Sequence, residues 1–301
     1  MSGTGLQFTI VAPAGFATDP DAIDRAEALL TGLGHRVRCD ATARTRFQRF
    51  AAPDDERLAA LERVAADGDT DVALMLRGGY GFTRLLDRID FAALARARKR
   101  WMGHSDFTAF QLAALARAAM VTFAGPMASY DFGARAPSAF MLANCFGVLE
   151  HAEWEVECAL DGPSRHACAG TLWGGNLALV AHLVGTSYLP DIRGGILFLE
   201  DVGEHPYRVE RMLYQLLHAG VLARQQAVLL GAFTEYQLNP NDAGYDLAAA
   251  IDHLRARVPV PIYAGLPFGH VPDKLTLPVG GRCAFEAIDG TARLRLSDYR
   301  V

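Results

Sequence analysis

Three residues that together could form a hydrolytic triad occur at the predicted ends of strands: Ser105, Glu200 and His270. Ser105 lies in Gly103-His-Ser-Asp106, between a strand and a helix, where a sharp turn can lift a nucleophile above the edge of a sheet. The segment departs from the Gly-x-Ser-x-Gly pattern, because Phe107 stands where that pattern has its second glycine. The alternative is structural: Ser105 or Asp106 would serve only as the N-cap of the following helix.

An acid and a base complete the set. Glu200 ends an apolar run, and a carboxylate at such a position can orient a histidine, although a solvated strand end is the alternative. His270 follows a glycine at another strand end and is the strongest base candidate of the nine histidines, with a surface loop as the alternative. His104 adjoins the serine, but adjacent residues at a strand end point apart. In this interpretation Ser105 attacks a carbonyl, His270 takes its proton and Glu200 fixes the tautomer of the imidazole.

A glycine-rich segment, Arg77-Gly-Gly-Tyr-Gly81, directly follows another predicted strand. Glycines there allow a close approach of the backbone to a ligand. The segment could bind a phosphate or dinucleotide, although its spacing fits neither Gly-x-Gly-x-x-Gly nor the Walker motif. It could instead aim a glycine N–H at a developing alkoxide, as an oxyanion hole does. A plain tight turn is the third interpretation.

Composition narrows the class of protein. The 301 residues are 51% hydrophobic and 21% charged, which is typical of a globular protein with a sizeable core. A net charge of −5 and the lack of a basic stripe argue against nucleic acid as a partner. The five cysteines form no Cys-x-x-Cys pair, and neither zincin motif occurs, so we expect no metal, no cofactor and a reduced, cytoplasmic protein. We expect neither a signal peptide nor a membrane-spanning segment.

The order of predicted elements indicates an α/β fold. Strands and helices alternate over the first 125 residues, which predicts a Rossmann-like parallel sheet. We expect a first domain over 1–134, an irregular connection over 135–164 and a β-rich C-terminal domain over 165–301. The latter ends in a hairpin that pairs Arg282–Ile288 with Thr291–Leu296 across Asp289-Gly290.

The sequence also resembles a known family. The motifs that carry the resemblance occur in one order along nearly the whole chain: Arg77-Gly-Gly-Tyr-Gly, Gly103-His-Ser-Asp, Phe123-Ala-Gly-Pro-Met, Gly170-Thr-Leu-Trp-Gly-Gly-Asn-Leu, Leu199-Glu-Asp, His205-Pro-Tyr-Arg-Val-Glu-Arg-Met-Leu and Gly265-Leu-Pro-Phe-Gly-His270. As an ordered set they closely resemble the serine LD-carboxypeptidases, also called muramoyltetrapeptide carboxypeptidases.

The resemblance implies a homodimer whose active site uses Ser105, Glu200 and His270. It assigns the oxyanion hole to the backbone N–H groups of Gly79 and Asp106, and it makes Asn176 and Arg77 possible substrate contacts. The implied reaction releases C-terminal D-alanine from a murein tetrapeptide by cleaving its bond to the L-centre of a diamino acid, as in cell-wall recycling. The related microcin C self-immunity peptidases, which cleave a peptidyl-nucleotide toxin, share these motifs.

Two other classes of function remain open at this point. A nucleotide-binding oxidoreductase could be built on the glycine-rich segment, and it would carry a cofactor detectable by absorbance. A non-catalytic peptide-binding protein would bind peptide equally well without Ser105.

Overall fold

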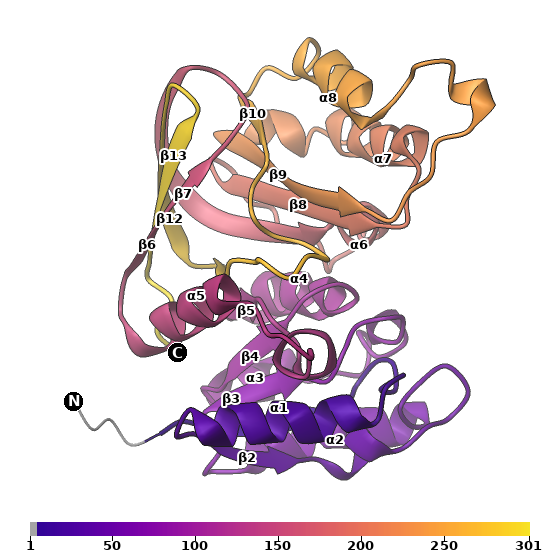
Figure 1. Ribbon diagram of the computed structural model, residues 1–301, viewed down its shortest axis with the longest axis vertical. Helices are drawn as coiled ribbons and strands as arrows, with labels where there is room; N and C mark the ends of the chain where they lie inside the picture. Colours follow the sequence, from indigo (N-terminus) through magenta and orange to yellow (C-terminus); the bar gives the residue numbers. More distant parts are fainter. Residues whose placement is uncertain (1–4) are drawn as a thin grey trace.

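Two β-sheets, stacked one above the other in Figure 1, form the framework of the protein. The computed structural model describes residues 5–301; Met1–Thr4, within the segment where no signal peptide is expected, lie outside it. No helix within the described range is long and apolar enough to cross a bilayer.

The first sheet has the strand order β11-β5-β4-β3-β1-β2. Its strands β1 to β5 are parallel, and the inner strands are buried because helices cover such sheets on both faces, whereas the edge strand β2 carries two arginines. This order is a doubly wound one, in which ligands bind beyond the carboxyl ends of the strands. The strands are β1 (Gln7–Val11), β2 (Arg36–Cys39), β3 (Val72–Met75), β4 (Arg100–Gly103) and β5 (Thr122–Ala124), and the helices are α1 (Asp21–Gly32), α2 (Asp54–Ala66), α3 (Phe91–Arg96) and α4 (Phe107–Ala118).

The second sheet has the order β10-β9-β8-β7-β12-β13-β6, and its strand pairing changes from parallel to antiparallel across the sheet. Strands β7 to β10 are parallel, whereas β12, β13 and β6 pair antiparallel and alternate buried with exposed residues. The strands are β6 (Trp154–Ala159), β7 (Arg165–Asn176), β8 (Ile196–Val202), β9 (Ala227–Thr234), β10 (Ile262–Ala264), β12 (Arg282–Ile288) and β13 (Thr291–Ser297); the helices are α6 (Leu177–His182), α7 (Pro206–His218) and α8 (Leu247–Arg255). The predicted hairpin is β12–β13 and is confirmed.

The expected irregular connection over 135–164 is wrong, because it contains regular structure. Helix α5 (Ala139–Glu150) begins where Ser138 Oγ accepts a hydrogen bond from Met141 N at 3.1 Å. Strand β6 then pairs with β13 at the edge of the second sheet. The segment therefore contributes a helix and the edge strand of the second sheet.

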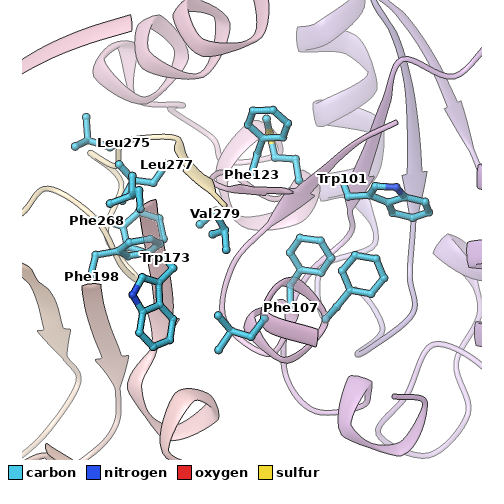
Figure 2. Close-up of a cluster of buried hydrophobic side chains, with 14 of the residues drawn as sticks. Trp101, Phe107, Phe123, Trp173, Phe198, Phe268, Leu275, Leu277 and Val279 are labelled. Atoms are coloured by element: carbon cyan, nitrogen blue, oxygen red, sulfur yellow. The ribbon is translucent and has the colours of Figure 1, made fainter. Parts of the chain in front are cut away.

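One strand crosses from the second half of the chain to the first sheet. β11 (Leu277–Val279) pairs antiparallel with β5. Leu277 and Val279 are fully buried, and Figure 2 shows them between aromatic side chains of the two sheets, with Trp173 and Phe268 to one side and Phe123 to the other. Because one hydrophobic cluster includes residues of both sheets, the core is continuous between them.

Candidate active site

A cavity of about 490 Å³ lies where the loops after several strands meet. Of the residues singled out from the sequence, it is lined by Arg77, Gly79, Ser105 and His270. These come from the loops after β3, β4 and β10, so both sheets contribute to the cavity. Glu200, Asp106 and Asn176 are buried and do not line it.

Ser105 lies on a strained turn between β4 and α4. Its φ of +64° is unusual for a residue with a side chain and costs on the order of 1–3 kcal/mol. Within residues 101–110 every neighbour is buried, whereas Ser105 is half-exposed. The N-cap interpretation is wrong for Asp106, whose side chain caps no helical N–H and instead accepts a hydrogen bond from Phe82 N at 3.0 Å. The turn therefore presents the serine hydroxyl to the cavity.

His270 and Glu200 form a hydrogen-bonded pair. His270 Nδ1 lies 2.7 Å from Glu200 Oε2, and the Glu200 side chain is 0% exposed. Strand β8 continues past Glu200 to Val202, so the solvated strand end considered above is wrong. With Nδ1–H donated to the carboxylate, Nε2 of His270 is left as the proton acceptor.

The glycine-rich segment packs directly against the serine. A Cβ atom on Gly78 would lie 2.6 Å from Ser105 Cβ and 3.3 Å from Asp106 N, so that only glycine fits there. Gly79 has φ +107°, a conformation that favours glycine. Arg57, which is fully buried, donates to the carbonyl oxygens of Gly81 and Pro13 and so fixes the loops after β3 and β1. No sequence signal singled out Arg57, which lies within α2.

Arg77 is a cation without a carboxylate partner. Within residues 5–301 it makes no ion pair, and its buried Nε has no hydrogen-bond partner. Its Nη1 donates to Phe16 O at 3.2 Å, and its guanidinium lies 5.3 Å from the centre of the Tyr130 ring. The guanidinium is therefore available to an anionic group in the cavity.

Asn176 has its side chain hydrogen-bonded inside the protein through both its oxygen and its nitrogen. Its Oδ1 caps α6 by accepting from Leu179 N, and its Nδ2 donates to Asp201 Oδ1 at 2.8 Å. Asp201 also accepts from Ala178 N, and burial raises its pKa to about 6. These contacts of Asn176 hold strand β8 in place at Asp201, the residue next to Glu200.

A polar group that no sequence motif indicates lies beside the histidine. His104, expected to point away from the serine, lines the same cavity, and its ring centre lies 5.0 Å from that of His270. Its Nε2 faces Lys274 Nζ, which in turn forms an ion pair with Asp131, and both of these residues also line the cavity. Burial, together with the charge of Lys274, lowers the pKa of His104 well below its ordinary value, so that this imidazole is neutral. No short sequence pattern connects these three residues.

The described residues 5–301 contain no group of three or more His, Cys, Asp or Glu side chains placed to hold a metal ion. Ser105 and His270 line the cavity, and Glu200 lies behind His270. This arrangement suits acyl transfer to a serine, with the developing negative charge facing the glycine-rich segment.

Comparison with known proteins identifies the family. Residues 9–125 match the LD-carboxypeptidase N-terminal domain, and residues 169–285 match the LD-carboxypeptidase C-terminal domain. The chain is 31% identical to the murein tetrapeptide carboxypeptidase of Pseudomonas aeruginosa, and the match covers 92% of each protein.

Solved structures agree with this match. The crystal structure of muramoyltetrapeptide carboxypeptidase from Oxalobacter formigenes is 44% identical, with a TM-score of 0.92 over 98% of this chain and 100% of that one. The structure of MccF with glutamyl sulfamoyl guanosine has a TM-score of 0.91 over 99% and 98% of the two chains, but at 19% identity it shows only that the fold is shared. The chain belongs to the LD-carboxypeptidase family and is an enzyme of that family.

Proposed function

We propose that this enzyme hydrolyses the L,D peptide bond before the C-terminal D-alanine of murein tetrapeptides and so releases D-alanine. The observation that carries the proposal is that His270 lines the same cavity as Ser105, which lies on a strained turn, while its other face is hydrogen-bonded to the buried Glu200 at 2.7 Å. The names of the P. aeruginosa and O. formigenes relatives support murein peptides as the substrate class.

In the proposed reaction Nε2 of His270 takes the proton of Ser105 as its oxygen attacks the carbonyl carbon of the scissile bond. The N–H groups of Gly79 and Asp106 stabilise the resulting oxyanion, and His270 then protonates the leaving amino group of D-alanine. Water, activated by the same imidazole, hydrolyses the acyl-enzyme. Glu200 keeps Nδ1 protonated throughout and stabilises the imidazolium, because its carboxylate is buried against that nitrogen.

Two charged groups define the substrate side of the cavity. The unpaired Arg77 guanidinium suits the C-terminal carboxylate of the peptide, because burying that carboxylate without a counter-charge is costly. Glu235, from the loop after β9, lines the cavity with a φ of +59°, and it adds a negative group that no sequence motif had singled out. Asn176 is buried and does not line the cavity, so it contacts substrate in this proposal only if the substrate reaches beyond the present wall.

The five cysteines are free thiols, which fits a reducing cytoplasm where recycled peptides are processed. We also propose that the enzyme is a homodimer. Size-exclusion chromatography with light scattering tests this assembly, for which a single-chain mass would be the contrary result.

Mass spectrometry of purified enzyme incubated with murein tetrapeptide tests the reaction. The expected products are the tripeptide and free D-alanine, formed by the wild type and not by Ser105→Ala. Activity that survives this substitution, or that disappears on chelation and returns with zinc, would contradict the serine mechanism.

The alternative is a self-immunity peptidase of the MccF kind, since MccF has been solved with aspartyl sulfamoyl adenosine. The 44% identity to the O. formigenes enzyme, against 20% to that MccF chain, favours the murein substrate. Parallel assays on tetrapeptide and on aspartyl sulfamoyl adenosine distinguish the two, and cleavage of the second alone would support the alternative.

A further inference from the structure

Lys274 and Asp131 form a buried ion pair at the wall of the cavity. Lys274 Nζ lies 2.6 Å from Asp131 Oδ1, and the two side chains are 3% and 4% exposed. The second oxygen of Asp131 accepts from Met127 N at 2.7 Å. Burying two charges costs several kcal/mol each and is often no more stabilising than an apolar pair, so stability alone is a weak explanation for this one.

The ion pair joins the two parts of the chain that carry the triad. Lys274 belongs to the same loop as His270, between β10 and β11. Asp131 lies in a π-helical turn (Ala128–Phe132) after β5 of the first sheet, whose neighbouring strand β4 leads to Ser105. Immediately beyond Lys274, Leu275 and Leu277 enter the core between the sheets (Figure 2). The pair thus fixes the loop of the histidine to the sheet of the serine.

His104 extends this contact to the face of His270. Its Nδ1 lies 2.9 Å from Gly125 O and donates to it, because a carbonyl oxygen can only accept. Its Nε2 is therefore an acceptor, and it faces Lys274 Nζ at 3.4 Å. The ring meets that of His270 edge to face, at an interplanar angle of 74°. A neutral ring held in this way confines His270 without competing for its proton.

We propose that Lys274, Asp131 and His104 are positioning residues, which hold the ring of His270 in reach of Ser105 across the junction of the two sheets. The inference rests on the triad of the proposed function. It explains how the base and the nucleophile, which are carried by different sheets, keep a fixed distance from each other. A displacement of about 1 Å in such a site can reduce the rate by about 10²-fold.

The chain provides a matched control for Lys274. It has only two lysines, Lys99 and Lys274, and both are buried. Lys99 Nζ donates to Asp67 O at 2.6 Å and to Thr70 O at 2.7 Å. These residues lie at the amino ends of the strands of the first sheet, opposite the ends that border the cavity. Lys99→Met and Lys274→Met therefore remove the same group from comparably buried positions, only one of which borders the cavity.

The experiment compares kcat, KM and Tm on murein tetrapeptide for Lys274→Met, Asp131→Asn, the double variant and Lys99→Met, with Ser105→Ala as the inactive reference. We expect Lys274→Met to lower kcat by about 10- to 100-fold while KM changes less than about threefold. Lys99→Met should lower Tm and leave kcat unchanged. The double variant should recover the Tm lost by Lys274→Met, because no unpaired charge stays buried, yet its kcat should stay low.

Different outcomes overturn different statements. If kcat recovers with Tm in the double variant, or if Lys274→Met behaves like Lys99→Met, the ion pair is only structural. If KM rises while kcat holds, Lys274 is a substrate contact. If Lys274→Met does not fold, the kcat of the double variant is the test: a low kcat supports the positioning role, and a wild-type kcat contradicts it. Activity retained by Ser105→Ala would instead contradict the proposed function itself.

Discussion

Glu200 has one carboxylate oxygen on His270, and its other oxygen, Oε1, is buried without a partner in the described part of the chain. Such a carboxylate is costly to bury, and its cost is offset when the imidazole beside it becomes charged. We therefore expect the charge of Glu200 to matter most in the transition state, when His270 carries the proton of Ser105.

The first prediction follows from that dependence. Ser105→Ala and His270→Ala should each lower kcat by about 10⁴- to 10⁶-fold, and the double variant should be little worse than either, because the residues act as a unit. Glu200→Gln, which preserves size but removes the charge, should cost less, about 10³- to 10⁴-fold. Steady-state kinetics with circular dichroism as a folding control measures this. Losses that multiply in the double variant would show independent roles.

A second prediction concerns the packing of Gly78 on Ser105. An alanine Cβ would lie 2.7 Å from Ser105 Oγ, so Gly78→Ala must displace the serine or the loop. We expect kcat to fall by at least about 10²-fold, the usual loss when one oxyanion donor is misplaced. Gly68→Ala is the control, because an added Cβ there meets nothing within 4 Å. Equal activity of the two variants would move the oxyanion hole away from this loop.

Strand β8 shows how the position of Glu200, the proposed acid of the triad, is determined. Its pairing with β9 shifts register between Leu199 and Asp201, where β9 carries one extra residue. Such irregularities redirect side chains and are common beside active sites. Glu200 occupies the shifted position and points to His270, while Asp201 turns to Asn176. The sequence predicted the strand but not the shift, which depends on the partner strand.

The neighbouring acid gives a third prediction, on stability. The pKa of Asp201 is about 6 in the folded protein, against about 3.9 in an unfolded chain. Between these values the folded state binds a proton that the unfolded state has released, so this contribution to stability is complete below pH 4 and is lost as the pH rises through 6.

Urea unfolding of the wild type and Asp201→Asn at pH 4 and pH 7 tests this effect. Other titrations cancel in the difference between the two proteins. The wild type should lose up to about 3 kcal/mol relative to the variant between these pH values. A constant difference across the range would mean that Asp201 titrates normally.

Some strands can be predicted from the sequence and others cannot. In the first sheet, the apolar runs over 6–12, 35–39, 71–76, 101–104 and 121–124 predict strands whose bounds lie within one residue of those observed. β6 was overlooked because its alternating Trp154, Val156 and Cys158 stand among glutamates and were interpreted as an acidic connection. β11 was overlooked because it is three residues long and contains Pro278, which is tolerated only at a sheet edge such as this one.

At the scale of the molecule, the proposed active site belongs to neither sheet alone. Ser105 follows β4 of the first sheet, whereas Glu200 lies in β8 and His270 follows β10 of the second, and the shared core sets the distance between them. Residue types and strand ends were enough to single out Ser105, Glu200 and His270; the last two are hydrogen-bonded to each other, and Ser105 and His270 line one cavity. The contact of Lys274 with Asp131 and His104 was not predictable, because it depends on how the loop before β11 returns to the first sheet.

The whole molecule is anionic, with a net charge of −5, although its proposed substrate ends in a carboxylate. The cavity must therefore supply positive charge locally. Lys274 is neutralised by Asp131, which leaves Arg77 as the cation without an anionic partner among the described residues that line the cavity. A bidentate contact between guanidinium and carboxylate is both strong and specific for a charged terminus.

The last prediction concerns recognition of the C-terminal carboxylate of the substrate by Arg77. The wild type should cleave a tetrapeptide ending in D-alanine at least about 10²-fold faster, in kcat/KM, than the same peptide ending in D-alaninamide. Arg77→Met should remove most of that preference by slowing the acid and leaving the amide nearly unchanged. Arg135→Met, which alters an exposed arginine next to the cavity-lining Ala134 and Ala136, should keep it. Release of alanine or alaninamide provides the measurement. Equal rates of the wild type on acid and amide would make the enzyme a general amidase, whereas a preference that survives Arg77→Met would assign the carboxylate to another group in the same cavity.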